Sequence, residues 1–306
     1  MMSDATLRKT TLLRRLLAAP EVLVAPRVHD AMSALAAESV GFKAVQASGH
    51  GIAASLLGEP DIGLLTLTES ALVTGYIARA VDIPVMADGD TGYGNALNVF
   101  RTVREFEAAG AASVNLEDQV SPKKCGHMEG KAVISAEEMV EKVHAACDAR
   151  RDPDFVICAR TDAIATHGID EAIRRANLYA EAGADLIFVE APTTREMIET
   201  VAREVSAPIT INIALGGKTP DVPWEELGRM GVARVSVGGS YFIGAEAQVR
   251  AHRHLLAHGT LAGTDFPMPR AEFYALLGKP EWDARERRYV SREEVATRYA
   301  RAAGVA

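Results

Sequence analysis

The chain alternates between short runs of apolar, often β-branched residues and longer stretches in which apolar residues recur every three to four positions. The short runs are residues 22–26, 43–48, 83–88, 112–118, 155–160, 185–190, 208–212 and 233–237. Stretches with helical periodicity lie between successive runs, as at residues 96–109, 136–151 and 169–182. Short continuous apolar runs are typical of parallel strands buried on both faces. Eight such βα units predict a closed (β/α)8 barrel of the TIM type.

An open, doubly wound parallel sheet is the alternative architecture for the same alternation. Its dinucleotide-binding form carries a glycine-rich turn after the first strand, and none follows residues 22–26. We therefore assign residues 1–260 to a (β/α)8 barrel catalytic domain. Residues 261–306 contain three prolines and a charged run, which predict a C-terminal helical extension. Such an extension is expected to cross to a neighbouring subunit or to seal the bottom of the barrel.

Composition and charge exclude several classes of partner. The formal net charge of -8 opposes the phosphate backbone of nucleic acid, and no run of Lys or Arg offsets it. No apolar run approaches the roughly 20 residues that a membrane span needs. Residues 7–17 carry an apolar stripe interrupted by charges, which predicts an amphipathic first helix docked on the barrel rather than a secretory signal.

The cysteines indicate a reducing compartment. The chain has three, Cys125, Cys147 and Cys158, and their spacings match neither a zinc site nor a disulfide framework. Cys147 lies in a predicted helix and Cys158 in a predicted strand, where we expect burial. A cytoplasmic location is the simplest expectation.

Acidic residues gather at the ends of the second, third and fourth predicted strand units. Asp88 and Asp90 end the third, where strand alternation points both the same way, and Glu117 and Asp118 end the fourth. Asp61 lies in the loop after the second strand. Carboxylates without thiolates or a pair of histidines suit a hard cation such as Mg²⁺ or Mn²⁺. Helix N-capping is the alternative for Asp61 or Asp118 taken singly, but the whole set predicts a metal site.

A polar loop with two glycines, residues 120–131, follows the fourth strand. Within it, Cys125 is flanked by Lys124, Gly126 and His127. Neighbouring cations lower the pKa of a thiol, and glycines allow a loop to close over a substrate. We therefore expect Cys125 to act as a nucleophile or a proton carrier.

Polar side chains also end other predicted strands. Arg160 follows the fifth strand, and its planar guanidinium can bind a carboxylate bidentately. Glu190 ends the sixth strand and Asn212 the seventh. Ser48 and Gly49 follow the second strand and offer a hydroxyl and backbone N–H groups to an anion. Because the carboxyl ends of barrel strands converge on one face, these groups predict an active site there.

Five motifs occur in order along the chain: ADGDTGYGN (87–95), LEDQ (116–119), KKCGH (123–127), ARTDA (159–163) and GGKTP (216–220). Together they resemble the isocitrate lyase and phosphoenolpyruvate mutase superfamily, and are most like its methylisocitrate lyase and 2,3-dimethylmalate (alkylmalate) lyase branch. The resemblance spans roughly residues 10–260. It implies a modified TIM barrel, Mg²⁺ or Mn²⁺, a 2-hydroxy di- or tricarboxylate substrate and a homotetramer in which the last barrel helix is swapped between subunits.

The resemblance also implies roles for individual residues. Asp88 looks like the direct metal ligand, while Asp61, Asp90 and Glu117 look like residues that hold the metal through waters. Cys125 looks like the catalytic acid. The full set of expected catalytic residues is Cys125, His127, Lys124, Arg160 and Glu190. The expected substrate-binding residues are Ser48, Gly49, His50, Asp88, Gly126, Arg160 and Asn212.

Three positions depart from the pattern of the methylisocitrate lyases. Gln46 stands where those enzymes have Tyr, Leu215 stands where Glu is usual before GGKTP, and His50 replaces a common glycine. The loss of a hydroxyl and a carboxylate from the pocket bears on the identity of the substrate more than on the type of reaction.

The resemblance implies a carbon-carbon lyase that cleaves a substituted malate or 2-methylisocitrate into a 2-keto acid and a smaller carboxylic acid. Two other activities use a similar metal site and can keep such a cysteine loop: oxaloacetate acetylhydrolase and carboxyphosphonoenolpyruvate phosphonomutase. A non-catalytic barrel that binds a keto acid is the alternative of another class, and the presence of Asp88, Glu117 and Cys125 argues against it.

Overall fold

The structure is a computed structural model, and it describes residues 7–264, 268–291, 293–294 and 297–298. The chain forms two compact units, Met1–Ala245 and Glu246–Ala306, and the division falls within α11 (Ser240–His258). The predicted domain boundary at residue 260 lies beyond this helix, and the division at 260 stays a prediction. The parts of the predicted extension at residues 265–267, 292, 295–296 and 299–306 lie outside the described residues.

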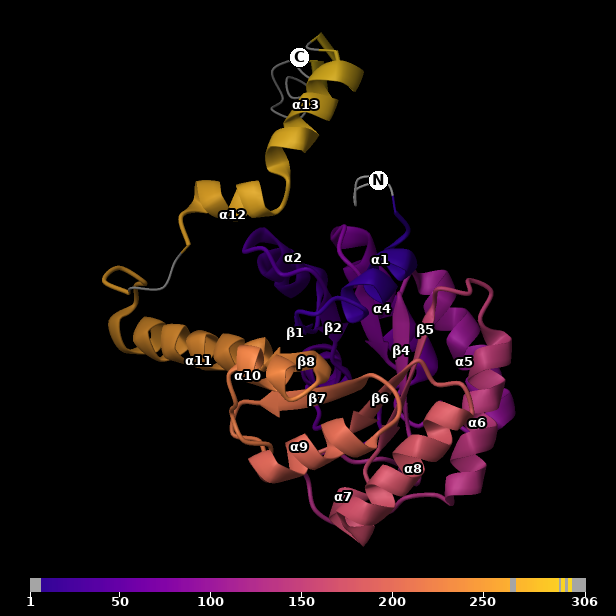
Figure 1. Ribbon diagram of the computed structural model, residues 1–306. Coiled ribbons are helices and arrows are strands. Elements are labelled where there is room, and N and C mark those ends of the chain that lie inside the picture. The colour runs from indigo at the N-terminus through magenta and orange to yellow at the C-terminus, as the bar shows by residue number, and fades with distance from the viewer. Residues whose placement is uncertain (1–6, 265–267, 292, 295–296, 299–306) are drawn as a thin grey trace. The chain divides into compact units, whose positions relative to one another are not determined.

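Within the described residues, eight parallel strands close a barrel in chain order (Figure 1). They are β1 (Leu23–Val28), β2 (Val45–Ala47), β3 (Val85–Asp88), β4 (Ser113–Glu117), β5 (Val156–Thr161), β6 (Leu186–Val189), β7 (Ile209–Ala214) and β8 (Val232–Gly238). The barrel closes because β1 pairs with β8, with Val24 beside Val235. The predicted (β/α)8 barrel is therefore confirmed, and the open sheet is excluded.

Helices cover the outside of the barrel in the first unit. They are α1 (Lys9–Leu17), α2 (Ala31–Ser39), α3 (Gly49–Ile52), the π-helical turn η2 (Ala53–Leu57), α4 (Leu67–Ala80), α5 (Ala96–Ala109), α6 (Ala136–Ala149), α7 (Ile164–His167), α8 (Ile169–Glu181), α9 (Arg195–Glu204) and α10 (Trp224–Arg229). The second unit contains α12 (Arg270–Leu276) and α13 (Lys279–Tyr289). No helix among the described residues is both long and apolar enough to span a bilayer.

Local chemistry explains where the helices begin and end. Helix α5 starts at a reciprocal cap between Asn95 and Asn98, and it ends at Gly110, whose φ of 91° is left-handed. Helix α6 starts after Ser135, whose side chain accepts a hydrogen bond from the backbone N–H of Glu138. These signals are present in the sequence, which is why the predicted range of α5 is correct to the residue.

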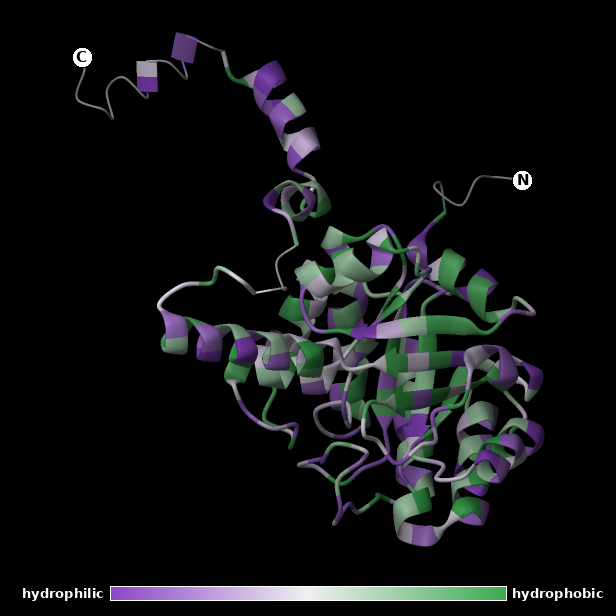
Figure 2. Ribbon diagram, turned by 90° about the vertical axis from the view of Figure 1, so that its left-hand side faces the viewer, coloured by the Kyte–Doolittle hydropathy of each residue, from purple (hydrophilic) through white to green (hydrophobic). Residues whose placement is uncertain are grey.

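The core has an inner and an outer layer. Inside the barrel, Leu23, Met86, Val156 and Leu186 pack together, and Leu13 of α1 joins them. Helix α1 thus docks on the barrel, as predicted for residues 7–17. A larger apolar cluster lies between the strands and the surrounding helices. Figure 2 shows hydrophobic colouring along the strands and mixed colouring on the helices, as expected for strands buried on both faces.

Candidate functional site

A polar cavity of about 50 Å³ lies at the carboxyl ends of the barrel strands. Ten of the predicted site residues line it: Ser48, His50, Asp61, Asp88, Cys125, Gly126, His127, Arg160, Glu190 and Asn212. The cavity is also lined by Arg27, Gln46, Asn115, Lys123, Phe188 and Ser236, none of which was predicted as a site residue. Convergence of strand ends on one face therefore brings together most of the predicted site. Gly49, Asp90, Glu117 and Lys124 do not line the cavity.

A buried lysine stands among the predicted metal ligands. Nζ of Lys123 lies 2.5 Å from Oδ1 of Asp61 and 2.9 Å from Oδ1 of Asp90. Although burial lowers the pKa of Lys123, the carboxylates around it raise that pKa well above its ordinary value, so the ammonium stays charged. Asp61 and Asp90 are thereby held beside one cation. The sequence prediction missed Lys123, although it belongs to the KKCGH motif.

The expected strand alternation of Asp88 and Asp90 is wrong. Asp88 ends β3, but Asp90 lies in the following turn with a left-handed φ of 46°. Asp is one of the few side chains that tolerate this conformation. The turn still directs Asp90 toward Lys123, so both carboxylates remain at the predicted end of the barrel.

The chemistry of these carboxylates fits a divalent cation. Burial raises the pKa of Asp90 to about 6 and that of Glu117 well above its ordinary value, even though Lys123 and Arg160 lie close by. Oδ1 of Asp90 is buried and lies outside hydrogen-bond geometry with Lys123. Buried carboxyl groups whose charge is incompletely neutralised are suited to a hard metal ion.

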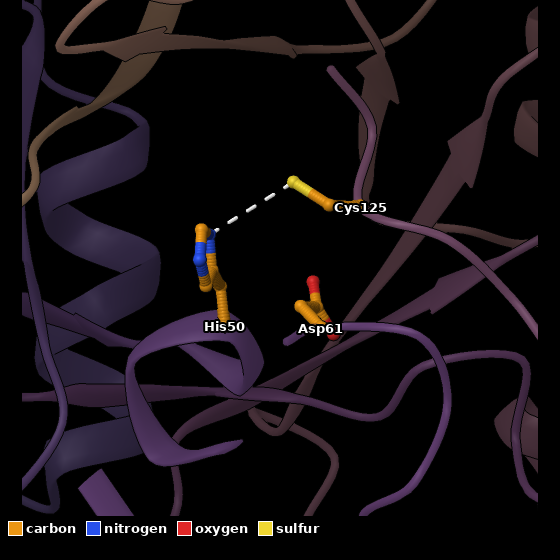
Figure 3. A group of neighbouring side chains, drawn as sticks. All are labelled: His50, Asp61 and Cys125. Atoms are coloured by element: carbon orange, nitrogen blue, oxygen red, sulfur yellow. Dashed lines mark hydrogen bonds between the residues drawn. The ribbon is translucent and has the colours of Figure 1, made fainter. Parts of the chain in front are cut away.

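Three side chains of mixed chemistry lie at the mouth of the cavity (Figure 3). One ligand atom from each of His50, Asp61 and Cys125 lies within 4.8 Å of the others. Sulfur, imidazole nitrogen and carboxylate oxygen are the ligands of a softer ion such as Zn²⁺, not of Mg²⁺. Among the described residues, the four predicted ligands Asp61, Asp88, Asp90 and Glu117 do not form a group this tight.

The environment of Cys125 corrects the expected effect of its neighbours. Burial raises the pKa of the Cys125 thiol, and Asp61 and Glu190 raise it further. A hydrogen bond from the backbone of His127 and the charge of Arg160 lower the pKa but offset the rise only in part. The thiol therefore stays protonated at neutral pH and is not a thiolate nucleophile. Of the two predicted roles, proton carrier is the one that this environment supports.

Lys124 is not part of the cavity, which corrects its predicted catalytic role. Its Nζ donates to the backbone oxygen of Glu129 at 3.4 Å, and its backbone is held by the side chain of Gln119. Alternate residues of an extended segment point in opposite directions, so Lys123 and Cys125 face the cavity while Lys124 faces away. The sequence suggested a cation beside the thiol but identified the wrong lysine.

Arg160 is bound mainly by carboxylates of its own chain. Its Nε and Nη2 donate to the two oxygens of Asp162 at 2.8 and 3.0 Å, and Nε lies 3.2 Å from Glu117. Nη1 lies 3.6 Å from Glu190, too far for a hydrogen bond. The predicted bidentate grip is therefore present, but Asp162 occupies it. Asp162 is held in turn by Lys131 at 2.7 Å.

Gly126 packs directly against this charged group. A Cβ at position 126 would stand 2.4 Å from Oε1 of Glu190 and 2.5 Å from Nη2 of Arg160. Only glycine allows the loop to approach so closely. Both carboxylate oxygens of Glu190 are buried without a hydrogen-bond partner, which marks them as groups that a bound molecule would satisfy.

His127 is neutral and its tautomer is defined. Burial lowers the pKa of His127, and Nδ1 accepts a hydrogen bond from the backbone N–H of Lys218 at 3.1 Å. The ring proton therefore lies on Nε2. Nε2 lies 3.5 Å from Oε1 of Glu190 and 3.4 Å from Nδ2 of Asn212. His127 is thus a hydrogen-bond donor at the cavity.

The predicted anion site at Ser48 and Gly49 is partly occupied by the protein itself. The backbone N–H of Gly49 donates to Oδ2 of Asp88 at 2.9 Å, and the Ser48 hydroxyl caps α3 by accepting from Gly51. A Cβ at Gly49 would lie 2.9 Å from the same oxygen. Gly49 therefore orients Asp88, which corrects its predicted role as a free donor to substrate.

Asp118 has a structural role that differs from helix capping. One of its oxygens accepts hydrogen bonds from Thr161 at 2.7 Å, Tyr179 at 2.8 Å and Arg175 at 3.1 Å, and the other accepts from the backbone N–H of Asp162. Asp118 therefore fixes the end of β5, where Arg160 lies.

Gln46 and Leu215, two of the three positions that depart from the methylisocitrate lyase pattern, offer little to a substrate in the cavity. Gln46 uses both ends of its amide inside the barrel, where Oε1 accepts from Arg234 and Asn115 while Nε2 donates to the oxygens of Ala47 and Met86. It therefore has little capacity left for a substrate. Leu215 is 65% exposed and does not line the cavity.

Comparisons with known proteins agree with this arrangement. A family model described as phosphoenolpyruvate phosphomutase matches residues 13–256. The 2,3-dimethylmalate lyase of Eubacterium barkeri is 46% identical over 268 residues, which is 87% of this chain and 93% of that protein. The 2-methylisocitrate lyase of Aeropyrum pernix is 45% identical over 281 residues, which is 91% of this chain and 90% of that protein.

A solved structure shows the same architecture with a small acid bound. Oxaloacetate acetylhydrolase in complex with the inhibitor 3,3-difluorooxalacetate has a TM-score of 0.85 and 32% sequence identity. The likeness covers 91% of this chain and 95% of that chain. The similarity therefore extends over most of the chain, including the barrel.

Proposed function

This chain belongs to the phosphoenolpyruvate phosphomutase family, which is part of the isocitrate lyase and phosphoenolpyruvate mutase superfamily, and we propose that it is a divalent-metal-dependent carbon-carbon lyase. Its substrate is a 2-hydroxy dicarboxylate of the substituted malate or 2-methylisocitrate type. Cleavage between C2 and C3 yields a 2-keto acid and a smaller carboxylic acid.

The observation that carries this proposal is the shared position of the thiol and the acidic cluster. Cys125 and Asp88 line one cavity, and burial keeps the thiol protonated. A lyase of this type leaves a carbanion on the departing acid, and a positioned proton donor completes the reaction. A protonated thiol beside an acidic metal-type site is therefore what the reaction requires.

The acidic cluster is the proposed metal site. Asp88 would hold Mg²⁺ or Mn²⁺ directly, and Asp61, Asp90 and Glu117 would hold it through waters. A bound dication would polarise the hydroxyl and the adjacent carboxylate of the substrate. Lys123 holds Asp61 and Asp90 close together before the metal arrives.

The remaining residues bind, orient and protonate the substrate. Arg160 and the Nε2–H of His127 stabilise the negative charge that develops on the departing acid, since preorganised donors act strongly in a closed site. Glu190 is held beside both and orients them. As the C2–C3 bond breaks, a base takes the proton of the substrate 2-hydroxyl and the bonding electrons pass to the departing carbon. Cys125 then transfers its proton to that carbon.

The loop of residues 120–131 has to move for the substrate to enter. A cavity of about 50 Å³ is well below the range of about 300–1,000 Å³ that ligand pockets commonly have. The loop closes the cavity through Cys125, Gly126 and His127, and it is fastened by a hydrogen bond from the Cys125 amide to the Asp61 carbonyl oxygen at 3.0 Å. Outward movement of this loop would open the site, and its return would exclude water during the reaction.

A coupled assay tests the proposed function. Purified protein is incubated with a panel of substituted malates, 2-methylisocitrate, oxaloacetate and a phosphonopyruvate, with Mg²⁺ or with a chelator. Release of pyruvate or glyoxylate from a hydroxy acid, lost with the chelator, supports the lyase. Oxalate and acetate from oxaloacetate would support the hydrolase instead, and a changed phosphorus-carbon bond would support the mutase. Turnover of none of these compounds overturns the proposal.

We also propose that the chain assembles through its last barrel helix into a helix-swapped homotetramer. A hollow of about 830 Å³ in the first unit is lined by Ile213, Val235 and Val237 of β7 and β8 and by the exposed Trp224. Helix α11 carries apolar side chains that are themselves exposed, Ile243 and Leu256 among them. A second copy of α11 in this hollow would cover both surfaces. Light scattering tests this, since a monomer would overturn it.

A cytoplasmic location remains a prediction.

A further inference from the structure

Arg27 is an arginine of the cavity that has no acidic partner. It lies near the end of β1, is 8% exposed and lines the cavity. Its Nη2 donates to the backbone oxygen of Gly238, and its guanidinium carbon lies 5.7 Å from the ring centroid of Tyr241. Its Nε is buried without a hydrogen-bond partner. Within the part of the chain that the structure describes, no carboxylate forms an ion pair with Arg27.

Arg160, on the opposite side of the cavity, is surrounded by carboxylates. Asp162, Glu117 and Glu190 all lie within 3.6 Å of its guanidinium nitrogens. Its charge is therefore already compensated by protein carboxylates. A substrate that brings two carboxylates into this cavity needs a further cation, because burying an unpaired carboxylate is costly.

The wall next to Arg27 offers hydrogen-bond donors. Ser236 lies beside Asn212 in the register of β7 and β8, and both line the cavity. The Ser236 oxygen accepts a hydrogen bond from Arg234 at 2.6 Å, so its hydroxyl proton is available to another acceptor.

The amide of Asn212 adds a second donor. Nδ1 of His127 accepts a hydrogen bond from the backbone of Lys218, so the proton of the neutral ring lies on Nε2, 3.4 Å from Nδ2 of Asn212. Two donors would face each other there, so the amide has to be turned over, with its oxygen toward His127. The amide nitrogen then takes the position of Oδ1, which is buried without a hydrogen-bond partner in a residue that lines the cavity.

A second unpaired guanidinium lies behind this wall. Arg234 is fully buried, and within the described residues its side chain contacts only uncharged groups: Gln46, Met86 and Ser236. Its positive charge therefore adds to the potential at this side of the cavity, since charges in a low-dielectric interior are weakly screened.

We propose that Arg27, together with Asn212 and Ser236, binds the substrate carboxylate that lies farthest from the acidic cluster. This subsite lies along β1, β7 and β8 and selects acids that carry a second carboxylate over those that carry one. The inference rests on the proposed function for the orientation of the substrate, because it assumes that the 2-hydroxy acid end lies at Asp88. It makes Arg27 a specificity-determining residue of the reaction.

Binding of matched acids to the Mg²⁺-loaded full-length protein tests this subsite. Malate and lactate share the 2-hydroxy acid end, but only malate has a distal carboxylate, and oxalate probes the metal end alone. Wild-type protein is expected to bind malate more tightly than lactate in titration calorimetry. Arg27→Gln is expected to weaken malate binding about 10- to 100-fold, the usual effect of losing a hydrogen bond to a charged group, and to change lactate and oxalate binding by less than about 2-fold.

Two further variants keep the outcome clear. Arg27→Lys, which retains the charge without the planar fork, is expected to restore part of the malate affinity. Arg101→Gln removes an exposed arginine from α5 and serves as the matched control. Equal loss for all three acids in Arg27→Gln, unchanged malate affinity, or no preference of the wild type for malate would each overturn the subsite. Failure of the lyase assay would overturn the proposed function and leave this binding comparison valid.

Discussion

The sulfur of Cys125 lies 3.9 Å from Nδ1 of His50, and the hydroxyl of Tyr241 lies 3.3 Å from the same nitrogen. Burial lowers the pKa of His50, so the ring is neutral near pH 7 and makes no salt bridge with a thiolate. The thiol and the imidazole are therefore uncharged neighbours held by polar contacts. This arrangement differs from the activated cysteine-histidine pairs of nucleophilic enzymes, in which the histidine is a charged partner of the thiolate.

Replacement of Cys125 by serine should separate chemistry from metal binding. The alcohol of Cys125→Ser is a much weaker acid than a thiol, so proton transfer to the carbanion should fail and turnover should fall at least about 100-fold. Mg²⁺ affinity, measured by calorimetry, should stay within about 2-fold, a difference of less than 0.5 kcal/mol. Cys147→Ser, at a half-buried cysteine on α6, is the control and should keep full turnover. Full activity of Cys125→Ser would reject the role of the thiol.

Zn²⁺ should inhibit the enzyme through the same neighbours. Tetrahedral zinc, with its usual bond lengths, places a cysteine sulfur and a histidine nitrogen about 3.6 Å apart. The separation between Cys125 and His50 is 3.9 Å, and Asp61 supplies a third ligand within reach. His50→Ala should raise the half-inhibitory Zn²⁺ concentration about 10- to 100-fold in the Mg²⁺-dependent assay. Identical zinc inhibition of wild type and variant would place the inhibitory ion elsewhere.

Lys123 should matter most when the metal is removed. Lys123→Met leaves Asp61 and Asp90 without their buried cation, and breaking such a pair costs about 3 kcal/mol of unfolding free energy. The variant should therefore melt well below wild type in a chelator and recover much of the difference when Mg²⁺ is added. Scanning calorimetry with and without Mg²⁺ measures this.

The neighbouring lysine provides the control for that experiment. Lys124→Met alters a side chain that hydrogen-bonds the backbone of Glu129 outside the cavity, so it should leave both melting temperatures nearly unchanged. A Lys123→Met protein that melts like Lys124→Met in the chelator would show that the two carboxylates do not depend on the ammonium.

The barrel and most of the cavity could be predicted because both depend on periodicity. A buried parallel strand needs a short apolar run, and the residue at its end points to the mouth of the barrel by geometry alone. Asp88, Arg160 and Asn212 were found in this way. Arg27 carries the same signal, since it directly follows the apolar run of residues 22–26, but that run ends at Pro26 whereas β1 continues to Val28.

The directions of loop side chains could not be predicted in this way. Asp90 reaches its place through a left-handed turn, and the choice between Lys123 and Lys124 depends on the path of a loop that is fixed by the side chain of Gln119 and by the backbone of Asp61, which is distant in sequence. The pKa of Cys125 was predicted in the wrong direction for a related reason. The neighbours in sequence are cations, which would lower the pKa of the thiol, whereas burial and the carboxylates of Asp61 and Glu190 raise it.

Asp118 should be important for stability rather than for contact with substrate. Asp118→Asn removes a charge that faces Arg175, and the new amide cannot accept all of the hydrogen bonds that the carboxylate accepts. Arg175 keeps its ion pair with Glu171, but breaking its buried pair with Asp118 is expected to cost about 3 kcal/mol in urea unfolding at pH 7. Asp148→Asn, at an exposed acid of α6, should change stability by less than about 0.5 kcal/mol. Equal stability of the two variants would contradict the structural role.

Glu171 should make a small contribution to stability that disappears in acid. Hydrogen bonds from Arg174 and Arg175 lower the pKa of Glu171 to about 2. A carboxyl group whose pKa is depressed on folding stabilises the fold above its ordinary pKa, 4.5, and loses that effect as the pH falls from 4.5 toward 2. The side chain is 24% exposed, so solvent screening limits the contribution to about 1 kcal/mol. Glu171→Gln should therefore unfold at a lower urea concentration than wild type at pH 7, and the gap between the two midpoints should narrow below pH 4.5 and close near pH 2. Glu181→Gln, at an exposed position of the same helix, should match wild type throughout, and a gap that stays constant from pH 7 to pH 2 would mean that packing, not charge, accounts for the difference.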